Sequence, residues 1–147
     1  MKIESIRIAF LAMVLGGALV FGLASKVPNV QADKEFSTKS IEGTWGFLSD
    51  GYMKEYGYTV STGLAMFDEK GICSIDILMN TEDNKQIKAR SERCEYSVRP
   101  DGTGTLISEF KEFGITTSDL VIVAKENKIL FIKMDKGSIV KGVFDRQ

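Results

Sequence analysis

The chain has 147 residues, with 19 basic and 20 acidic side chains, a net charge of −1 and no histidine. The lack of histidine excludes Ser-His and Cys-His catalysis and removes the most common metal ligand. We therefore expect no cofactor and no metal site. The charges are scattered without a basic stretch, which argues against nucleic acid and anionic membranes as partners.

The first 32 residues have the order of a secretory signal peptide. Lys2 and Arg7 form a short basic start, and residues 8–24 follow without a charge. Val30-Gln31-Ala32 then offers small residues at the −3 and −1 positions of a cleavage site. This order predicts that residues 1–32 are a signal peptide, and that the rest of the chain is secreted or periplasmic.

An uncleaved membrane anchor is the alternative for the same segment. Its uncharged run of 17 residues lies between the roughly 7–15 of a signal peptide and the roughly 20 of a membrane span. Cleavage after Ala24 also stays open. No cysteine lies near the cut, so a lipid anchor is not expected. Without Lys2, Arg7, Lys26 and Glu4, residues 33–147 have 16 basic and 19 acidic side chains, a net charge of −3. Their number suits a single domain.

Alternating polar and apolar residues dominate the chain after Pro28, with β-branched and aromatic types on the apolar positions. Turns rich in Gly and Asp interrupt the pattern about every 8–12 residues. The pattern predicts eight strands, over Gly43–Leu48, Tyr58–Phe67, Ile72–Asn80, Lys88–Arg99, Thr103–Phe110, Asp119–Lys125, Lys128–Lys133 and Ser138–Phe144.

Short connections between these strands favour an all-β, antiparallel up-and-down arrangement. An open sheet of eight strands would leave two bare edges, and closure into a barrel removes them. A two-sheet sandwich is the rival and needs longer crossovers. The longer link over residues 49–57 is expected to form a loop over the barrel mouth. A polar site there could use Asp50, Tyr52, Glu55, Tyr56 and Tyr58.

The turns also predict which residues face each other. A turn centred on Asp83-Asn84 places Cys73 directly opposite Cys94, with Ile75, Ile77 and Met79 on the same face. Closing the preceding turn at Phe67 and Ile72 sets Met66 against Cys73, Leu64 against Ile75 and Val60 against Met79. A loop at Pro100–Gly102 sets Leu106 against Tyr96, with Ser108 and Phe110 on the same face. A slip by one residue would invert each of these sets.

The two cysteines of an exported chain favour a disulfide. Such a bridge between Cys73 and Cys94 would close a loop of about 20 residues and contribute on the order of 3 kcal/mol. A redox pair and two buried thiols are the alternatives, although the spacing is far from Cys-x-x-Cys.

A sequence resemblance rests on both ends of the domain. Gly43-Thr44-Trp45 near the start of the first strand and Arg146 at the end of the last one resemble the lipocalin (calycin-type) pattern. The resemblance implies that Arg146 lies over Trp45 and closes the barrel. The motifs Gly43–Phe47, Phe67–Gly71, Tyr96–Leu106, Asp119–Val123 and Gly142–Gln147 are together similar to small bacterial exported proteins of uncharacterised function.

The leading functional hypothesis is non-catalytic binding of a small apolar or amphipathic molecule. An eight-stranded barrel either fills with side chains or holds one small ligand. The candidate lining residues are Val60, Leu64, Met66, Ile75, Ile77, Met79, Tyr96, Val98, Leu106 and Phe110.

Two other classes of function are also compatible with the sequence. A side-chain-filled barrel could be an interaction module of the cell envelope or a homodimer, since Leu120–Ala124 and Ile129–Met134 are apolar on both faces. A cyclase-like barrel enzyme is the third class, and no catalytic residue is assigned for it. Asp76, Glu95 and Glu109 are the mid-strand acids, and we expect them to form solvated cross-strand pairs.

Overall fold

The computed structural model describes residues 35–123, 127–133 and 135–147. The segment predicted as a signal peptide lies outside this part of the chain. Within the described ranges, none of the helices has the length and apolar character needed to cross a membrane. A short 3-10 helix, η1 (Thr38–Ile41), precedes the strands.

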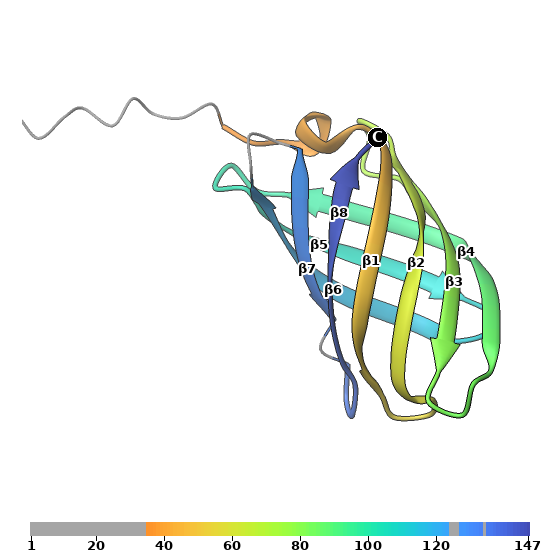
Figure 1. The fold of residues 1–147 in the computed structure, drawn as a ribbon. Helices are drawn as coiled ribbons and strands as arrows, with labels where there is room; N and C mark the ends of the chain where they lie inside the picture. The colour runs from red at the N-terminus through yellow and green to blue at the C-terminus, as the bar shows by residue number, and fades with distance from the viewer. Residues whose placement is uncertain (1–34, 124–126, 134) are drawn as a thin grey trace, which may run out of the picture. The chain divides into compact units, whose positions relative to one another are not determined.

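Eight antiparallel strands form one closed barrel, as the sequence predicted (Figure 1). Each strand pairs with the next in the chain, and β8 returns to pair with β1. The strands are β1 (Gly43–Met53), β2 (Gly57–Phe67), β3 (Cys73–Thr81), β4 (Gln86–Val98), β5 (Thr103–Phe110), β6 (Gly114–Val123), β7 (Lys128–Lys133) and β8 (Ile139–Arg146). Closure leaves no bare sheet edge, so the backbone of every strand has partners on both sides.

The link predicted over residues 49–57 is mostly strand, and that prediction was wrong. β1 runs on to Met53, and only residues 54–56 separate it from β2. Asp50 and Gly51 are turn-forming residue types, which suggested a loop. They take strand positions because β2 and β8 flank them and pair with both. Likewise β6 begins at Gly114, earlier than predicted, and its first residues pair with the end of β5.

The register between β2 and β3 differs by one residue from the predicted one. Phe67, not Met66, lies opposite Cys73. The turn is longer than expected because the Asp68 carboxylate accepts hydrogen bonds from the backbone N–H groups of Lys70 and Ile72, at 2.9 and 2.8 Å. One extra turn residue moves every β2 side chain to the other face.

The β3–β4 hairpin contains two registers. Asp76 pairs with Arg90, one residue off the prediction, whereas Ile72 bridges to Glu95 in the predicted register. A bulge in β4 between Ser91 and Arg93 accounts for the change. The backbone N–H of Ile75, next to the bulge, donates to the Ser91 hydroxyl at 2.9 Å.

Candidate binding cavity

Inward side chains divide the barrel into two halves of different character. Along β1 the inward positions near η1 hold Trp45 and Phe47, both buried, and the positions farther along hold Ser49 and Gly51. β2 repeats the change in the opposite order, since Thr59 and Ser61 precede Ala65 and Phe67 on its inward face. Large rings therefore fill the end near η1, and small residues leave space at the other end.

The end near η1 is closed by the pair that the lipocalin resemblance implied. Trp45 is fully buried and lies opposite Arg146 in the β1–β8 register. The Arg146 guanidinium carbon lies 4.5 Å from the indole centroid, and its nitrogens donate to the backbone oxygens of Glu42 and Ser40 at 2.7 and 2.8 Å. Trp45 Nε1 donates to the Ile41 oxygen at 2.9 Å, which ties η1 to the barrel end.

Aromatic rings pack edge-to-face next to the Trp45–Arg146 pair. Phe67 contacts Trp45, Tyr96 and Phe144 edge-on, with ring centroids 6.5, 5.0 and 5.7 Å apart. The Tyr96 hydroxyl donates to the backbone oxygens of Thr38 and Asp68. Burial, followed by the nearby carboxylates of Asp68 and Glu42, raises the pKa of Tyr96 to about 12. This half of the barrel is therefore a packed aromatic core.

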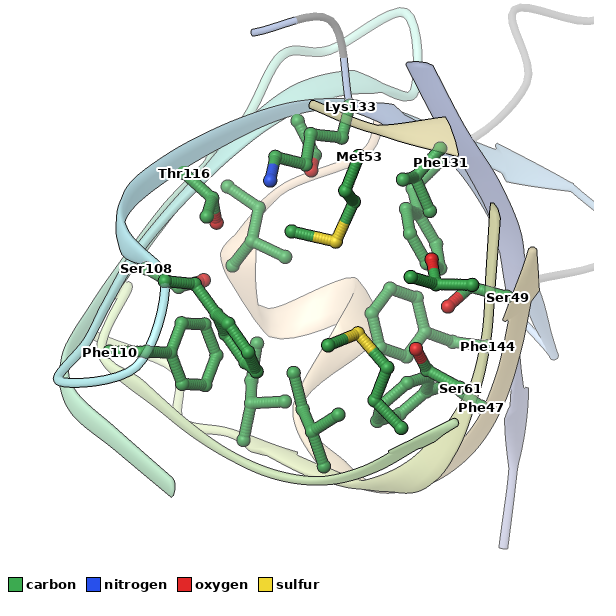
Figure 2. A pocket seen from close by; sticks show the side chains of 18 residues that line it. Phe47, Ser49, Met53, Ser61, Ser108, Phe110, Thr116, Phe131, Lys133 and Phe144 are labelled. Carbon is green, nitrogen blue, oxygen red and sulfur yellow. The ribbon is translucent and has the colours of Figure 1, made fainter. Parts of the chain in front are cut away.

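The other half encloses a cavity of about 90 Å³. Figure 2 shows it with the labelled side chains around its rim. It is smaller than the roughly 300–1,000 Å³ of pockets for drug-sized ligands. The lining residues are Phe47, Ser49, Met53, Thr59, Ser61, Ile75, Ile77, Met79, Leu106, Ser108, Phe110, Phe113, Thr116, Ser118, Phe131, Lys133, Val140 and Phe144.

The predicted lining residues fall into three groups. Ile75, Ile77, Met79, Leu106 and Phe110 lie on the cavity wall. Tyr96 and Val98 belong to the packed half, where Tyr96 is buried and Val98 packs partly exposed against the core.

Val60, Leu64 and Met66 were placed on the wrong face of β2. They point outward, with exposed fractions of 43%, 51% and 47%. The longer turn after Phe67 is the cause, because it shifts β2 by one residue against β3. Thr59 and Ser61 take the positions on the cavity wall instead.

Several cavity residues were not foreseen, above all the serines of β1, β2 and β6 and Lys133. Their signal in the sequence is the period of two: Ser49 follows the inward Phe47, and Lys133 follows Phe131 on β7. β1 was expected to end at Leu48, which hid the first of them.

Lys133 is the one charged side chain among the described residues that line the cavity. Its side chain is only 11% exposed, and its Nζ points into the space in Figure 2. Nζ lies 3.2 Å from a carboxylate oxygen of Asp135, and the other oxygen of Asp135 accepts from the Thr117 backbone N–H at 3.3 Å. The ion pair is thus anchored to β6.

Phe113, on the cavity wall, is contacted from the turn after β1 by an aromatic side chain. Tyr56, in the turn after β1, donates its hydroxyl to the Glu112 oxygen at 2.8 Å. Its ring meets Phe113 edge-on, with centroids 5.8 Å apart. The expected polar cluster at the mouth does not form, because Asp50 and Tyr58 bond to each other at 2.9 Å on the outer surface.

Two of the three mid-strand acids, Asp76 and Glu95, pair with arginines on the outside of the barrel, and of these two Asp76 alone does so across strands, as expected. Asp76 lies 3.5 Å from Arg90 across the hairpin, and Glu95 lies 2.8 Å from Arg93 on its own strand. All four side chains are well exposed. These carboxylates therefore do not face the cavity.

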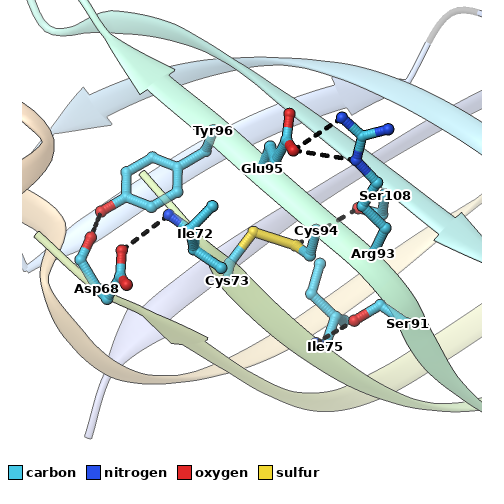
Figure 3. The surroundings of a disulfide bond; sticks show 10 residues. All are labelled: Asp68, Ile72, Cys73, Ile75, Ser91, Arg93, Cys94, Glu95, Tyr96 and Ser108. Carbon is cyan, nitrogen blue, oxygen red and sulfur yellow. Dashed lines mark hydrogen bonds and ion pairs between the residues drawn. A yellow bond between two sulfur atoms is a disulfide. The ribbon is translucent and has the colours of Figure 1, made fainter. Parts of the chain in front are cut away.

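The disulfide joins Cys73 and Cys94, as predicted, with their Cα atoms 4.9 Å apart. Figure 3 shows it between β3 and β4, close to the hydrogen bond from Ile75 to Ser91. The bulge in β4 is what brings the two cysteines opposite each other.

The outer wall has a row of apolar side chains on four neighbouring strands. Val121 pairs with Leu130, Leu130 with Val143, and Val143 with Leu48. Val121, Leu130 and Leu48 are exposed, and Val143 is half-buried. Lys141 and Asp145 flank Val143 on the same outward face of β8.

Comparison with known proteins supports the fold alone. No family model and no curated protein matches the chain. A de novo designed fluorescence-activating β-barrel matches with a TM-score of 0.53 and 15% identity, over 75% of this chain and 96% of the barrel. A redesigned barrel, mFAP1, bound to DFHBI, matches with a TM-score of 0.55 and 15% identity, over 74% of this chain and 97% of that one.

Proposed function

We propose that this chain is an exported, lipocalin-like barrel protein that binds a small apolar or amphipathic molecule without catalysis. The observation that carries the proposal is the cavity in the half of the barrel away from η1, whose wall is mainly apolar. The similar designed barrels include one bound to the small molecule DFHBI, which supports a binding role for this fold.

The size of the cavity restricts the ligand. A space of about 90 Å³ suits a slender chain or a small group rather than a large ring system. Met53 and Met79 lie on the wall, and methionine side chains adapt readily to a ligand. We therefore expect a narrow apolar portion to enter and the polar end to stay near the mouth.

Export is proposed on two grounds. The N-terminal sequence has the order of a signal peptide. The disulfide between Cys73 and Cys94 fits an oxidising compartment, since such bonds persist outside the cytoplasm.

The test is binding of hexan-1-ol, a neutral amphiphile, to the protein as its host produces it, measured by calorimetry. Ser118 lies on the cavity wall, so Ser118→Leu should fill the space and abolish binding. Its neighbour Thr117 is exposed, and Thr117→Leu is the matched control that should keep binding. Native mass spectrometry should show a co-purified small molecule in the unaltered protein. Absence of both signals would refute the proposal.

A second candidate function is self-association through the outer apolar row. A two-fold axis along this row would place Lys141 of one copy against Asp145 of the other, where they would join the ion pairs that Lys141 forms with Asp50 at 4.0 Å and Asp145 with Lys128 at 2.9 Å in one copy. We expect Leu48→Ser to lower the mass measured by sedimentation, whereas Ile107→Ser, an exposed change on β5, should not. A monomer at all concentrations would rule this candidate out.

A further inference from the structure

We propose that the cavity selects anionic amphiphiles, and that Lys133 binds their carboxylate. The inference rests on the proposed binding function and adds the class of ligand. It follows from where the structure places the single charged side chain among the described cavity residues.

Lys133 is held in the wall and not at the surface. It is the last residue of β7, and its strand partners are Ser118 on β6 and Val140 on β8, which both line the cavity. An ammonium among apolar side chains is costly to bury unless it has a partner. Asp135 supplies that partner at 3.2 Å.

Asp135 meets the ammonium of Lys133 through one carboxylate oxygen, Oδ2, because its other oxygen accepts from β6. Its carboxylate is tied to β6 through the Thr117 backbone N–H, which fixes its position. An ammonium has three N–H donors, so donors are left for a ligand in the cavity. In Figure 2 the Lys133 nitrogen points towards this space, on the side of the barrel where Thr116 lies.

The hydroxyl-bearing residues near Lys133 extend the polar site. Thr116 and Ser118 lie on the same face of β6, two residues apart, and both line the cavity. A carboxylate has two oxygens, so one can accept from Lys133 while the other accepts from a hydroxyl. Deeper in the cavity, Phe47, Ile77 and Phe144 form an apolar wall for the tail. The charge, the hydroxyls and the apolar wall together match an acid with a narrow hydrocarbon chain.

The test compares three probes of equal chain length: hexanoate, hexan-1-ol and hexylamine. In the protein from its host, hexanoate should bind about 10- to 100-fold more tightly than hexan-1-ol, as expected for a hydrogen bond to a charged group. Hexylamine should bind most weakly, because its charge repels Lys133. This order needs no variant, so it decides the inference even where a substitution prevents folding.

The variants assign the effect to Lys133. Lys133→Gln should reduce the affinity for hexanoate to that for hexan-1-ol, and Lys133→Arg should keep the preference for the acid. Lys141→Gln removes an exposed lysine from the outer wall and is the matched control. Equal affinities for hexanoate and hexan-1-ol, or a preference that survives Lys133→Gln, would overturn the inference and leave the binding function standing. Failure of hexan-1-ol to bind would instead count against the binding function itself.

Discussion

The Arg146 guanidinium lies 4.5 Å from the centroid of the Trp45 indole, at the point where the last strand meets the first. The two residues are direct partners in the β1–β8 ladder, so their contact spans the closure of the barrel. Arg146 also binds the backbone oxygens of Ser40 and Glu42, which attaches the η1 segment to the same closure.

Removing this guanidinium should destabilise the fold. Arg146→Met loses the contact with the indole, worth about 0.5–2 kcal/mol, and two hydrogen bonds to backbone oxygens. We expect the free energy of unfolding in urea to fall by about 2–3 kcal/mol. Arg146→Lys should recover only part of this lost free energy of unfolding, because an ammonium cannot donate in the fork geometry of arginine. Arg90→Met, at an exposed ion pair, is the control and should cost less than about 1 kcal/mol.

The disulfide should stabilise the domain mainly through the unfolded state. Replacing both Cys73 and Cys94 by Ser should cost about 3 kcal/mol, since the bridge closes a loop with a sequence separation of 21. Thermal unfolding of the double variant should show a Tm lower by roughly 10 °C. The bridge itself is checked by counting thiols in the original protein, denatured but not reduced. No titratable thiol is expected, and two titratable thiols would contradict the bridge.

One side-chain hydroxyl binds the backbone of β3 beside the bulge in β4. Ser91 accepts from the backbone N–H of Ile75 at 2.9 Å, where the regular β3–β4 ladder stops. Ser91→Ala should leave this partly buried N–H without its acceptor and cost about 1–2 kcal/mol in denaturant unfolding. Ser91→Thr should be close to the original protein, and Ser97→Ala, an exposed change on the same strand, should have little effect. Equal losses for the two alanine variants would show that the hydroxyl is not needed.

Tyr96 should make the fold sensitive to alkali. Its pKa is raised to about 12 in the folded protein, first by burial and then by Asp68 and Glu42, from an ordinary value of 10.0. Between these two values the unfolded chain loses its phenolic proton while the folded protein retains it. The unfolded state therefore binds fewer protons, and stability falls as the pH rises from about 10 to about 12.

Tyr96→Phe should remove this part of the alkaline slope, although it also removes the hydroxyl donor to Thr38. Unfolding free energies at several pH values give the slope, and tyrosinate absorbance follows the ionisation. Tyr52→Phe, at an exposed position, is the control. An unchanged slope in Tyr96→Phe would contradict the assignment.

The number of strands, their antiparallel order and the cysteine pairing could be predicted because they depend on local patterns. Alternation marks the strands, and Gly or Asp marks the turns, for example at residues 100–102 between β4 and β5. The facing of Leu106 and Tyr96 was correct for the same reason. These features need no knowledge of distant contacts.

The register of β2 and the extent of the cavity depend on details that such patterns do not contain. One carboxylate, that of Asp68, sets the length of a turn and so the facing of a whole strand. The bulge near Ser91 also changes the register between β3 and β4, and this change places Cys73 opposite Cys94. Lys133 could not be placed in the cavity from composition, because a lysine at a strand end is usually solvated.

The confinement of empty space to one half of the barrel has a consequence for protein engineering. Ser49, Ser61 and Ser118 can be exchanged for larger or more polar side chains while the ring stack under Trp45 keeps its contacts. Under the proposed binding function, such substitutions would change which ligands the cavity accepts without weakening the contacts between the first and last strands. The domain is therefore a starting point for designed sensors. Under the proposed binding function, the cavity half would determine ligand selectivity and the packed half under Trp45 would maintain the stability of the fold.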